Sequence, residues 1–526
     1  MPDFKQTSAL SDLARKRLAQ RQRAEQRFRF YGQMAVAMAG TVLLVLLFTI
    51  VGEARSAFTR HSVVLPVPVE ARTTSQLLTA VRTEMSAPFD LSPVRSLQND
   101  IASLVSPLTV SRVAKTLDDE NGPASGERRV ELAISDEADQ YLKGRTTKRR
   151  TGTISVGKHT EGWVAADGAA VQALLAGVKT FSPLDDDDGT TLLSSDRPSL
   201  LLFLSDGVHR VRSIEADRIG VDLLAAADFP ASQAGRYILL ETPADLRSVR
   251  DRTIAVVEVL RSYDMISRGF NAALFLNADS NEAELAGVLA ALTGTVLMIL
   301  VAVCIALPIG VSAAVYLEEF APDTPFTRLV TVNINNLASV PSIVFGLLGA
   351  AVLVNGIPAT IPFTDIGFSL GGGLGRGWPL VGGAVLAIMT LPTVIISSRA
   401  AIASVPQGTR EAAFSLGASR MQAVAHHVLP QAVPGIMTGS IIGLARAIGE
   451  TAPLLLLGMF AFIAEVPDSV TDRSNALPVL IFDWSTRAER AFEPLTAAAI
   501  VILLLIMLVM NALAIWIRMK YEQRRD

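Results

Sequence analysis

The fold is decided by residues 411–457, EAAFSLGASRMQAVAHHVLPQAVPGIMTGSIIGLARAIGETAPLLLL. The first part, 411–430, is polar, ends in a proline and carries Arg420, His426 and His427, so it cannot lie in lipid. The second part, 435–463, is apolar enough to span a bilayer, yet it holds Arg446 and Glu450 in its middle. A polar segment that leads directly into a charged membrane helix suits a protein that passes force from a soluble partner to a membrane gate.

The composition indicates a membrane protein rather than a soluble enzyme. Half of the 526 residues are hydrophobic, only 18% are charged, and the mean hydropathy is +0.39. The single cysteine, Cys304, lies in an apolar run, which excludes a disulfide framework within the chain and a cysteine metal site.

The short motifs favour neither an enzyme nor a metal site. The run GTISVGKH at 152–159 nearly matches a phosphate-binding loop, but His159 replaces the hydroxyl residue that binds magnesium. The five histidines, at positions 61, 159, 209, 426 and 427, lack metal-ligand spacing apart from the adjacent pair. We therefore predict no ATP site, no catalytic constellation, no metal and no cofactor.

The N-terminal half divides at one apolar segment. Residues 1–29 hold eight Lys and Arg against three Asp and Glu, and a transmembrane helix is predicted over 30–51. The basic flank places residues 1–29 in the cytoplasm by the positive-inside rule. Residues 52–284 hold 26 basic against 33 acidic residues, a net charge of −7, and are predicted to form a periplasmic α+β domain inserted between helices 1 and 2.

Several segments of that domain carry local signals. The run PVPVEA at 66–71 predicts an extended segment, and residues 162–177 have small and apolar residues at helical spacing. Residues 199–217, with Asp206-Gly207 between apolar runs, predict a β-hairpin. Residues 244–266 predict an amphipathic helix. The acidic run 185–188 lacks the alternation of a calcium loop and is expected to be a solvated loop.

The C-terminal half predicts a transmembrane domain over 285–518, with helices near 285–307, 329–354, 379–398, 435–463 and 494–517. With the first span these make an α-helical polytopic membrane protein of six transmembrane helices. A polar loop lies at 404–430 and a cytoplasmic tail at 519–526. Basic residues gather in the loops on the N-terminal side, which predicts an inner-membrane protein with both termini in the cytoplasm.

Three motifs resemble a known family. The EAA at 411–413, Gly417 and the LP at 429–430 resemble the EAA loop of type I ABC-importer permeases, where this loop is a short coupling helix that docks on the ATP-hydrolysing subunit. The runs NINNLASVPSIVFGLLG at 333–349 and ARAIGETAPLL at 445–455 are similar to the PstA family, the permease subunits of phosphate importers. The resemblance covers roughly residues 283–518 and does not cover most of 52–280.

The resemblance assigns a coupling role to Glu411, Ala412, Ala413, Gly417, Leu429 and Pro430. Physically, Glu411 suits the dipole at the start of a short helix, and the alanines let that helix lie in a partner's groove. Gly417 permits the turn that follows. His427 stands where the family pattern has an aliphatic residue, with Val428 beside it, and we expect docking to remain intact.

Arg446 and Glu450 are four residues apart and are predicted to share one helix face. A charge at mid-membrane costs ~2.5–3.5 kcal/mol, so the pair should face a partner or a water-filled path. One interpretation is an ion pair that fixes helix packing. The other is an anion pathway, in which the guanidinium grips two oxyanion oxygens and Glu450 holds it when the site is empty.

Four polar residues extend this candidate pathway. Thr451 could donate a hydroxyl to an anion, although such hydroxyls more often bond to a backbone carbonyl. Asn333, Asn335 and Asn336 lie near the start of an apolar segment. They could line the path, or they could form hydrogen bonds between helices at the membrane edge. Gly346 and Gly349, after a break at Pro341 and Ser342, are expected to allow close packing.

By this resemblance the chain is expected to be the permease subunit of a phosphate ABC importer. The implied partners are a PstC-like permease as heterodimer partner, a PstB-like ATPase dimer, a PstS-like periplasmic phosphate-binding protein and membrane lipid, with no nucleic acid. Two alternatives stay open. The oxyanion could be sulfate or molybdate, or the chain could be a membrane sensor that uses residues 52–284. The inserted domain is expected to dock the binding protein or to cap the channel mouth.

Overall fold

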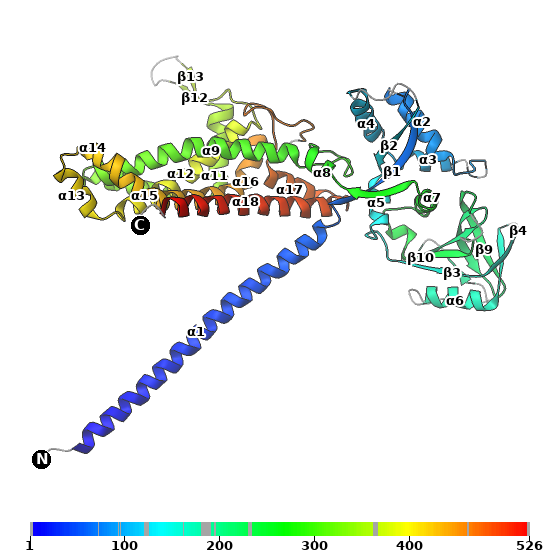
Figure 1. Ribbon diagram of the computed structural model, residues 1–526, viewed down its shortest axis with the longest axis horizontal. Helices are drawn as coiled ribbons and strands as arrows, with labels where there is room; N and C mark the ends of the chain where they lie inside the picture. The colour runs from blue at the N-terminus through cyan, green and yellow to red at the C-terminus, as the bar shows by residue number, and fades with distance from the viewer. Residues whose placement is uncertain are drawn as a thin grey trace.

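The computed structural model describes residues 4–522 except 72, 93, 95, 120–125, 161, 180–190, 194–195, 230–233, 361–366 and 460–461. Two regions lie end to end (Figure 1). A bundle of apolar helices, residues 289–522, forms the membrane domain, and residues 59–276 form an extramembrane domain at one end of the bundle. The α+β character expected for the inserted domain is confirmed.

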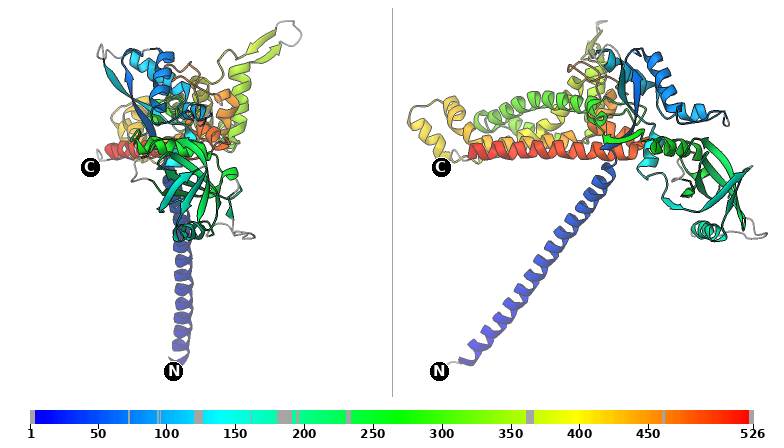
Figure 2. Two further views of the ribbon diagram at one scale, coloured as in Figure 1. Left: turned by 90° about the vertical axis from the view of Figure 1, so that its right-hand side faces the viewer. Right: turned by 45° about the vertical axis from the view of Figure 1, so that its right-hand side comes forward.

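The long N-terminal helix α1 (Phe4–Ala54) diverges from the bundle in every view (Figures 1 and 2). The C-terminal end of α1 contacts α18 (Phe492–Glu522), and Ile50, Ala54 and Ala57 join an apolar cluster there. The most apolar 18 residues of its stretch Glu25–Ala54 are all unburied in the single chain, and burial begins only at Ala54. A helix this apolar and this exposed needs lipid or another subunit around it.

The extramembrane domain has two lobes. In the first lobe, helices pack on the antiparallel sheet β11–β1–β2. The register of this sheet pairs Thr59 with Phe270 and Ser62 with Ala133. The extended segment expected at 66–71 is met only in part, because residues 66–68 end β1 and residues 69–70 form a turn. The elements of this lobe are β1 (Thr59–Pro68), α2 (Thr74–Ser86), α3 (Leu97–Ala102), α4 (Pro107–Asp119), β2 (Glu127–Ala133), α5 (Asp136–Leu142), α7 (Asp251–Ser262), β11 (Ile266–Phe270) and α8 (Ala273–Leu276).

The second lobe is an antiparallel sheet that wraps around its own core. The strand order is β3–β10–β7–β8–β9–β5–β4, and β3 and β4 are separated by only two residues of one continuous segment. The two ends of the sheet therefore meet, and α6 (Gly168–Lys179) packs Val171, Leu174 and Val178 into the core. The strands are β3 (Arg149–Thr153), β4 (Val156–Thr160), β5 (Trp163–Ala166), β6 (Thr191–Leu192), β7 (Pro198–Leu204), β8 (Gly207–Ile214), β9 (Arg218–Ala226) and β10 (Arg236–Pro243).

The local predictions for this domain have mixed outcomes. The hairpin is confirmed, because β7 and β8 pair around a turn at Ser205-Asp206. The helix predicted over 244–266 is α7, which is shorter than expected. Its residues 253–260 are all buried, because the other elements of the first lobe cover one side of α7 and the wrapped sheet of the second lobe covers the other. This stretch therefore has no solvated face and is not amphipathic. The acidic run 185–188 lies outside the described residues.

Four long helices form the membrane domain: α9 (Leu289–Val315), α12 (Pro379–Ala403), α15 (Leu429–Ile448) and α18. Small residues let α9, α12 and α15 approach closely, since Gly310 lies against Val394, Gly383 against Val301 and Gly435 against Ala401. Among the described residues, five helices are long and apolar enough to cross a bilayer, and a bent pair makes a sixth if it counts as one span.

That bent pair corrects the span expected at 329–354. The segment consists of α10 (Pro325–Leu337) and α11 (Ser342–Gly349), which continues as a π-helical turn to Asn355, and the chain bends by 101° between them. Pro341 causes the break, because it cannot donate a backbone hydrogen bond and disfavours helix at Val340. A short hairpin, β12 (Ile357–Thr360) and β13 (Gly367–Leu370), follows.

The span expected at 435–463 is also not one helix. Its helix α15 begins at Leu429 and ends at Ile448, with Gly449 as its C-cap. The chain then forms α16 (Ala452–Leu454) and a π-helical turn through Met459, in which Gly458 has φ +80°. The region expected as a loop at 464–493 contains a further helix, α17 (Leu477–Thr486), packed against α9 and α18.

Candidate functional site

The EAA segment forms a short helix with a well-defined end. Helix α13 (Gln407–Ser415) begins after Pro406 and stops where Gly417 adopts φ +83°. The N–H of Gly417 donates to the carbonyl of Phe414 at 2.9 Å, and that of Ala418 donates to the carbonyl of Ala413 at 3.1 Å. This pair of bonds is a Schellman motif, which favours glycine because of the left-handed backbone.

One face of α13 is exposed in the single chain. Glu411 and Ala412 are exposed, whereas Ala413 is buried against the π-helical turn that precedes α15. Leu429 and Pro430 are the first two residues of α15, so the LP of the motif starts the membrane helix. Three further apolar side chains beside the EAA residues are exposed and were not predicted as part of the site: Phe414, Leu416 and Met421. Their only signal in the sequence is an apolar residue in a polar loop.

The other face is tied to the end of α9, where a π-helical turn runs from Tyr316 to Phe320. Arg410 of α13 pairs with the buried Glu319 at 2.6 Å and also donates to the carbonyls of Val405 and Ile402 at 2.7 and 3.1 Å. Glu318 of the same turn accepts from Arg399 of α12 at 3.2 Å. Helix α13 is therefore joined by side-chain contacts to the end of α9 and to the end of α12.

Arg446 and Glu450 lie on either side of a helix end. Arg446 is in the last turn of α15, and Glu450 follows the helix, with 3.8 Å between Nε and the nearest carboxylate oxygen. The prediction that both sit mid-helix is therefore wrong, because α15 ends at Gly449. The Arg446 side chain is 75% exposed in the single chain, while that of Glu450 is 24% exposed.

A cavity lies between the two broken spans. It is lined by the ends of α10 and α11, by α12 and by α15, and its lining includes Leu337, Ser342, Phe345, Thr390, Arg446 and Glu450. Ser342 is the first residue of α11, so a helix N-terminus, with the positive end of its dipole, reaches the cavity that Arg446 also lines. Both features favour an anion.

The breaks are also packed against each other. A Cβ on Gly346 of α11 would lie 2.6 Å from the Cα of Pro453 in α16, so the two backbones touch there without an intervening side chain. Gly349 likewise leaves room for Val385 of α12. The close packing expected at these two glycines is confirmed.

The other candidate pathway residues lie outside the cavity lining. Asn333, Asn335 and Asn336 are exposed on α10, and Asn333 donates to the carbonyl of Leu329 in its own helix at 2.9 Å. The side chains of Asn335 and Asn336 form no hydrogen bond with a described residue. Thr451 is partly buried at the start of α16, and its hydroxyl likewise has no partner among the described residues.

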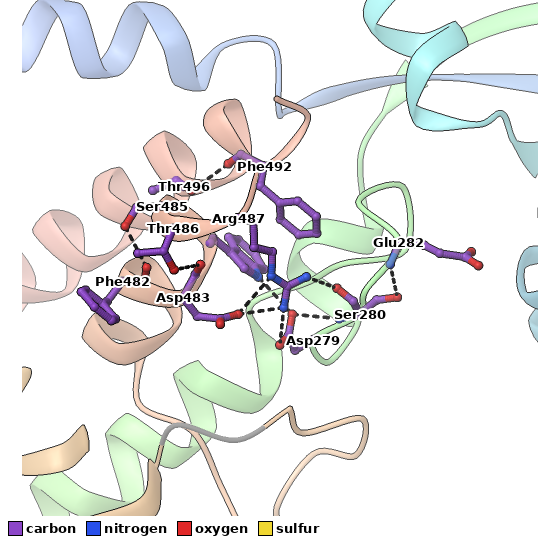
Figure 3. A network of polar contacts seen from close by, with 11 residues as sticks. Asp279, Ser280, Glu282, Phe482, Asp483, Ser485, Thr486, Arg487, Phe492 and Thr496 are labelled. Atoms are coloured by element: carbon purple, nitrogen blue, oxygen red, sulfur yellow. Dashed lines mark hydrogen bonds and ion pairs between the residues drawn. The ribbon is translucent and has the colours of Figure 1, made fainter. Parts of the chain in front are cut away.

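A polar network fixes the linker between the two domains (Figure 3). Arg487, after α17, donates to Asp483 at 2.7 Å and to the carbonyl of Ser280 at 3.0 Å, and approaches Asp279 at 3.5 Å. Asp279 is buried and also accepts from Nε1 of Trp484 at 3.0 Å. Phe492 lies under the guanidinium, with its ring centroid 4.3 Å away.

A second contact region joins α5 to the membrane helices. Nη2 of Arg145 lies 2.7 Å from Glu53 at the end of α1 and 3.7 Å from Glu493 at the start of α18. Beside it, Asp136 and Glu284 line a small cavity between the domains. Burial, reinforced by Asp139, raises the pKa of Asp136 to about 6, and burial raises the pKa of Glu284 to about 7.

Among the described residues, the structure groups one set of potential metal ligands, His159, Asp206 and His209 in the second lobe. The spacing of the histidines did not predict this set, because His159 and His209 come from different strands of the wrapped sheet. Strand β4, which carries His159, lies at the opposite end of the molecule from α13 (Figure 1).

Comparisons with known proteins separate the same two regions. Residues 306–523 match the family described as binding-protein-dependent transport system inner membrane component, and residues 15–151 match a domain of unknown function, DUF3333. The second match extends from α1 through the elements β1 to α5 of the first lobe and ends within β3; α7, β11 and α8 of that lobe lie outside it.

Individual relatives resemble the membrane domain. The phosphate transport system permease protein PstA of Mycobacterium leprae (strain TN) is 33% identical over 222 residues, which are 42% of this chain and 67% of that protein. PstA 1 of Mycobacterium tuberculosis (strain CDC 1551 / Oshkosh) is 30% identical over 239 residues, 45% of this chain and 73% of that protein. A solved inward-facing structure of the MetNI methionine ABC transporter is 18% identical, with a TM-score of 0.33 over 44% of this chain and 94% of that chain.

Proposed function

Because the chain belongs to the PstA-type permeases of ABC importers, we propose that it carries inorganic phosphate across the cytoplasmic membrane while a separate subunit hydrolyses ATP. The chain is a multi-pass inner-membrane transport component and not itself the catalyst. The similarity to PstA proteins over the membrane domain carries the proposal, and the coupling helix and the cavity beside Arg446 supply a physical route for it.

The coupling route begins at α13. A PstB-like ATPase dimer docks on the exposed face formed by Glu411, Ala412, Phe414 and Leu416, where apolar side chains at the surface of a polar loop gain from burial. Closure of the ATPase moves α13, and the Arg410–Glu319 pair passes this movement to α9. Gly417 ends the helix, so α13 can move as one unit against α15.

The anion route passes Arg446. A guanidinium that is 75% exposed on a membrane helix is costly in lipid, so we infer that a PstC-like permease covers this face and completes a water-filled path. Phosphate oxygens then bind the guanidinium fork and the N–H groups at the start of α11. Glu450, 3.8 Å from Arg446, competes for the same donors and limits how tightly the anion is held.

The remaining assignments complete the complex. Both termini lie in the cytoplasm, which places residues 59–276 on the periplasmic side, where a PstS-like protein delivers phosphate. We propose that this extramembrane domain docks that protein or caps the channel mouth, because it sits at the end of the bundle opposite the coupling helix (Figure 1). Thr59 and Phe270 are paired neighbours in the sheet, so residues 60–269 can be replaced by a two-residue turn. Unchanged uptake and apparent affinity in that variant would exclude docking.

The function is tested by the ATPase activity of the complete complex reconstituted in lipid. Phosphate-loaded binding protein should stimulate hydrolysis, sulfate should not replace phosphate, and Glu411→Arg should abolish the stimulation. Stimulation by sulfate or molybdate instead would keep the architecture and change the substrate. An assembled wild-type complex that no anion stimulates would contradict the transport function and favour the sensor.

Arg446→Gln separates the two interpretations of the charged pair. The anion route predicts that uptake is lost while the complex still assembles, because glutamine keeps a donor but loses the charge and the fork. Arg473→Gln, at an exposed position in the segment between α16 and α17, is the matched control and should transport normally. Loss of assembly in Arg446→Gln would instead support a packing role.

A further inference from the structure

Three side chains from separate segments converge on the surface of the second lobe. His159 lies on β4, Asp206 in the turn between β7 and β8, and His209 on β8. Nδ1 of His159 is 3.0 Å from one oxygen of Asp206, and Nε2 of His209 is 3.1 Å from the other. One ligand atom from each residue lies within 4.8 Å of the other two.

The backbone holds Asp206 in place. The N–H groups of Ala227 and Phe229 donate to the carbonyls of Asp206 and Ser205 at 3.2 and 3.1 Å, so the turn is bound to the chain that follows β9. The next residue, Gly207, has φ +147°, and a Cβ there would clash with the carbonyl oxygen of Ala225. The carboxylate is therefore presented by a turn that rests on β9.

The imidazole of His209 presents one nitrogen toward the other two side chains. The residue is 1% exposed, its buried Nδ1 has no hydrogen-bond partner among the described residues, and its Nε2 faces Asp206. Imidazole is the commonest side-chain ligand of metal ions, and Nε2 is the nitrogen placed to bind one here.

Asp206 supplies the negative charge. The two imidazoles approach different oxygens of this carboxylate, and the three ligand atoms lie within 4.8 Å of one another. In a tetrahedral zinc site with bonds of about 2.0–2.1 Å, ligand atoms are about 3.3 Å apart, close to the separations from Asp206.

We propose that His159, Asp206 and His209 bind a divalent transition-metal ion, with zinc the best match. Two nitrogen donors and one oxygen donor exclude a calcium or magnesium preference, since those ions take oxygen ligands. His159 and Asp206 are both exposed, which leaves a fourth position open to water or to a further donor. The ion ties β4, an end of the sheet, to the hairpin in its middle.

The proposal is tested with the purified full-length chain, free of affinity tags and treated with chelator. Isothermal titration with zinc chloride should show one saturable site per chain, and zinc should raise the thermal stability. His159→Ala should weaken binding by roughly 100-fold or more and abolish the stabilisation, because a first ligand is lost. His159 is chosen because its side chain is exposed and its removal leaves the core intact.

The control is the double variant His426→Ala and His427→Ala, which removes the adjacent exposed pair in the coupling segment. This double variant should bind zinc at the site formed by His159, Asp206 and His209 with the same affinity as the wild-type chain. Asp206→Asn, which keeps the shape and removes the charge, should also weaken binding. Absence of a saturable site in the wild-type chain, or equal zinc affinity in His159→Ala, would overturn the proposal and leave the three residues as a hydrogen-bonded clasp.

Discussion

Nη2 of Arg410 lies 2.6 Å from Oε1 of Glu319, although the two residues are 91 positions apart in the chain. Both side chains are largely buried, and Arg410 also caps two carbonyls at the end of α12. Helix α13 is thus fixed to the end of α9 by an ion pair that is largely shielded from solvent. Such a pair is costly to break from one side, because the remaining charge stays buried.

Glu319→Gln should therefore disturb coupling without removing the coupling surface. The buried guanidinium of Arg410 loses its counter-ion, at a cost of about 3–5 kcal/mol if the site does not relax. We expect the ATPase to bind still, while phosphate-stimulated hydrolysis falls several-fold; pull-down and hydrolysis assays on one preparation separate these effects. Asp323→Asn breaks an exposed pair with Arg328 and is the matched control. Equal activity in both variants would contradict the role of the buried pair.

Gly346→Ala should weaken the contact between the two broken spans. Its Cβ would lie 2.6 Å from the Cα of Pro453, so a backbone must move, which costs about 1–3 kcal/mol. The expected result is a lower melting temperature of the complex in lipid and reduced uptake. Gly40→Ala on α1, where a Cβ meets nothing within 4 Å, is the control. A Gly346→Ala complex as stable as the control would show that α11 and α16 are not tightly packed.

Features that depend on local chemistry could be predicted from the sequence. The end of α13 follows from Gly417, and the β7–β8 hairpin follows from Asp206-Gly207 between apolar runs. The direction of the chain after a break could not be predicted, because hydropathy is continuous through 338–340 although the helix turns by 101° there. The end of α15 at Gly449 was missed for the same reason.

Pairings between distant segments were also beyond the sequence. Glu319 and Arg410, or His159 and Asp206, are brought together by helix packing and by the wrapping of a sheet, neither of which is encoded in residue spacing. Residues 244–266 show the complementary error. A helix with one strongly apolar face was predicted to have a solvated face, but two lobes of one domain cover it on both sides.

The carboxyls at the domain junction predict a pH dependence. The folded-state pKa is raised to about 6 for Asp136 and to about 7 for Glu284, so the folded state prefers both groups protonated. Their favourable contribution is complete below the unfolded pKa values, near pH 4, and is lost as the pH rises through 6 and 7. The contact between α5 and the linker should therefore loosen from pH 5 to pH 8, by an order of 1–3 kcal/mol for each group.

Hydrogen exchange of the full-length chain measures this loosening. Peptides from 134–145 and 280–288 should exchange faster at pH 8 than at pH 5, after correction for the intrinsic pH dependence of exchange. The double variant Asp136→Asn and Glu284→Gln should remove the difference and protect both segments at pH 8. Glu127→Gln, at an exposed position on β2, is the control. Faster exchange at pH 8 that persists in the double variant would assign the effect to other groups.

Arg487 should contribute more than Arg490, three residues later, to holding the extramembrane domain against the helix bundle. Truncation of Arg487 to alanine leaves Asp279 buried with only the indole N–H of Trp484 as a side-chain donor, and it frees Asp483 and the carbonyl of Ser280. Removing one partner of a largely buried ion pair costs about 3–5 kcal/mol, and the loss of packing on Phe492 adds to it. Arg490 is exposed, so Arg490→Ala should cost less than ~1 kcal/mol.

Limited proteolysis of the complex in lipid distinguishes these two arginine variants. Arg487→Ala should expose the linker 277–288 to cleavage, which gives one fragment with α1 and the extramembrane domain and one with the rest of the bundle, whereas Arg490→Ala should match the wild-type pattern. Arg487→Lys should give an intermediate result, since an ammonium can pair with one carboxylate but cannot span Asp279, Asp483 and the Ser280 carbonyl with a planar fork. Equal cleavage in all three variants would mean that the apolar cluster around Trp484 and Phe492, rather than the arginine, holds the two domains together.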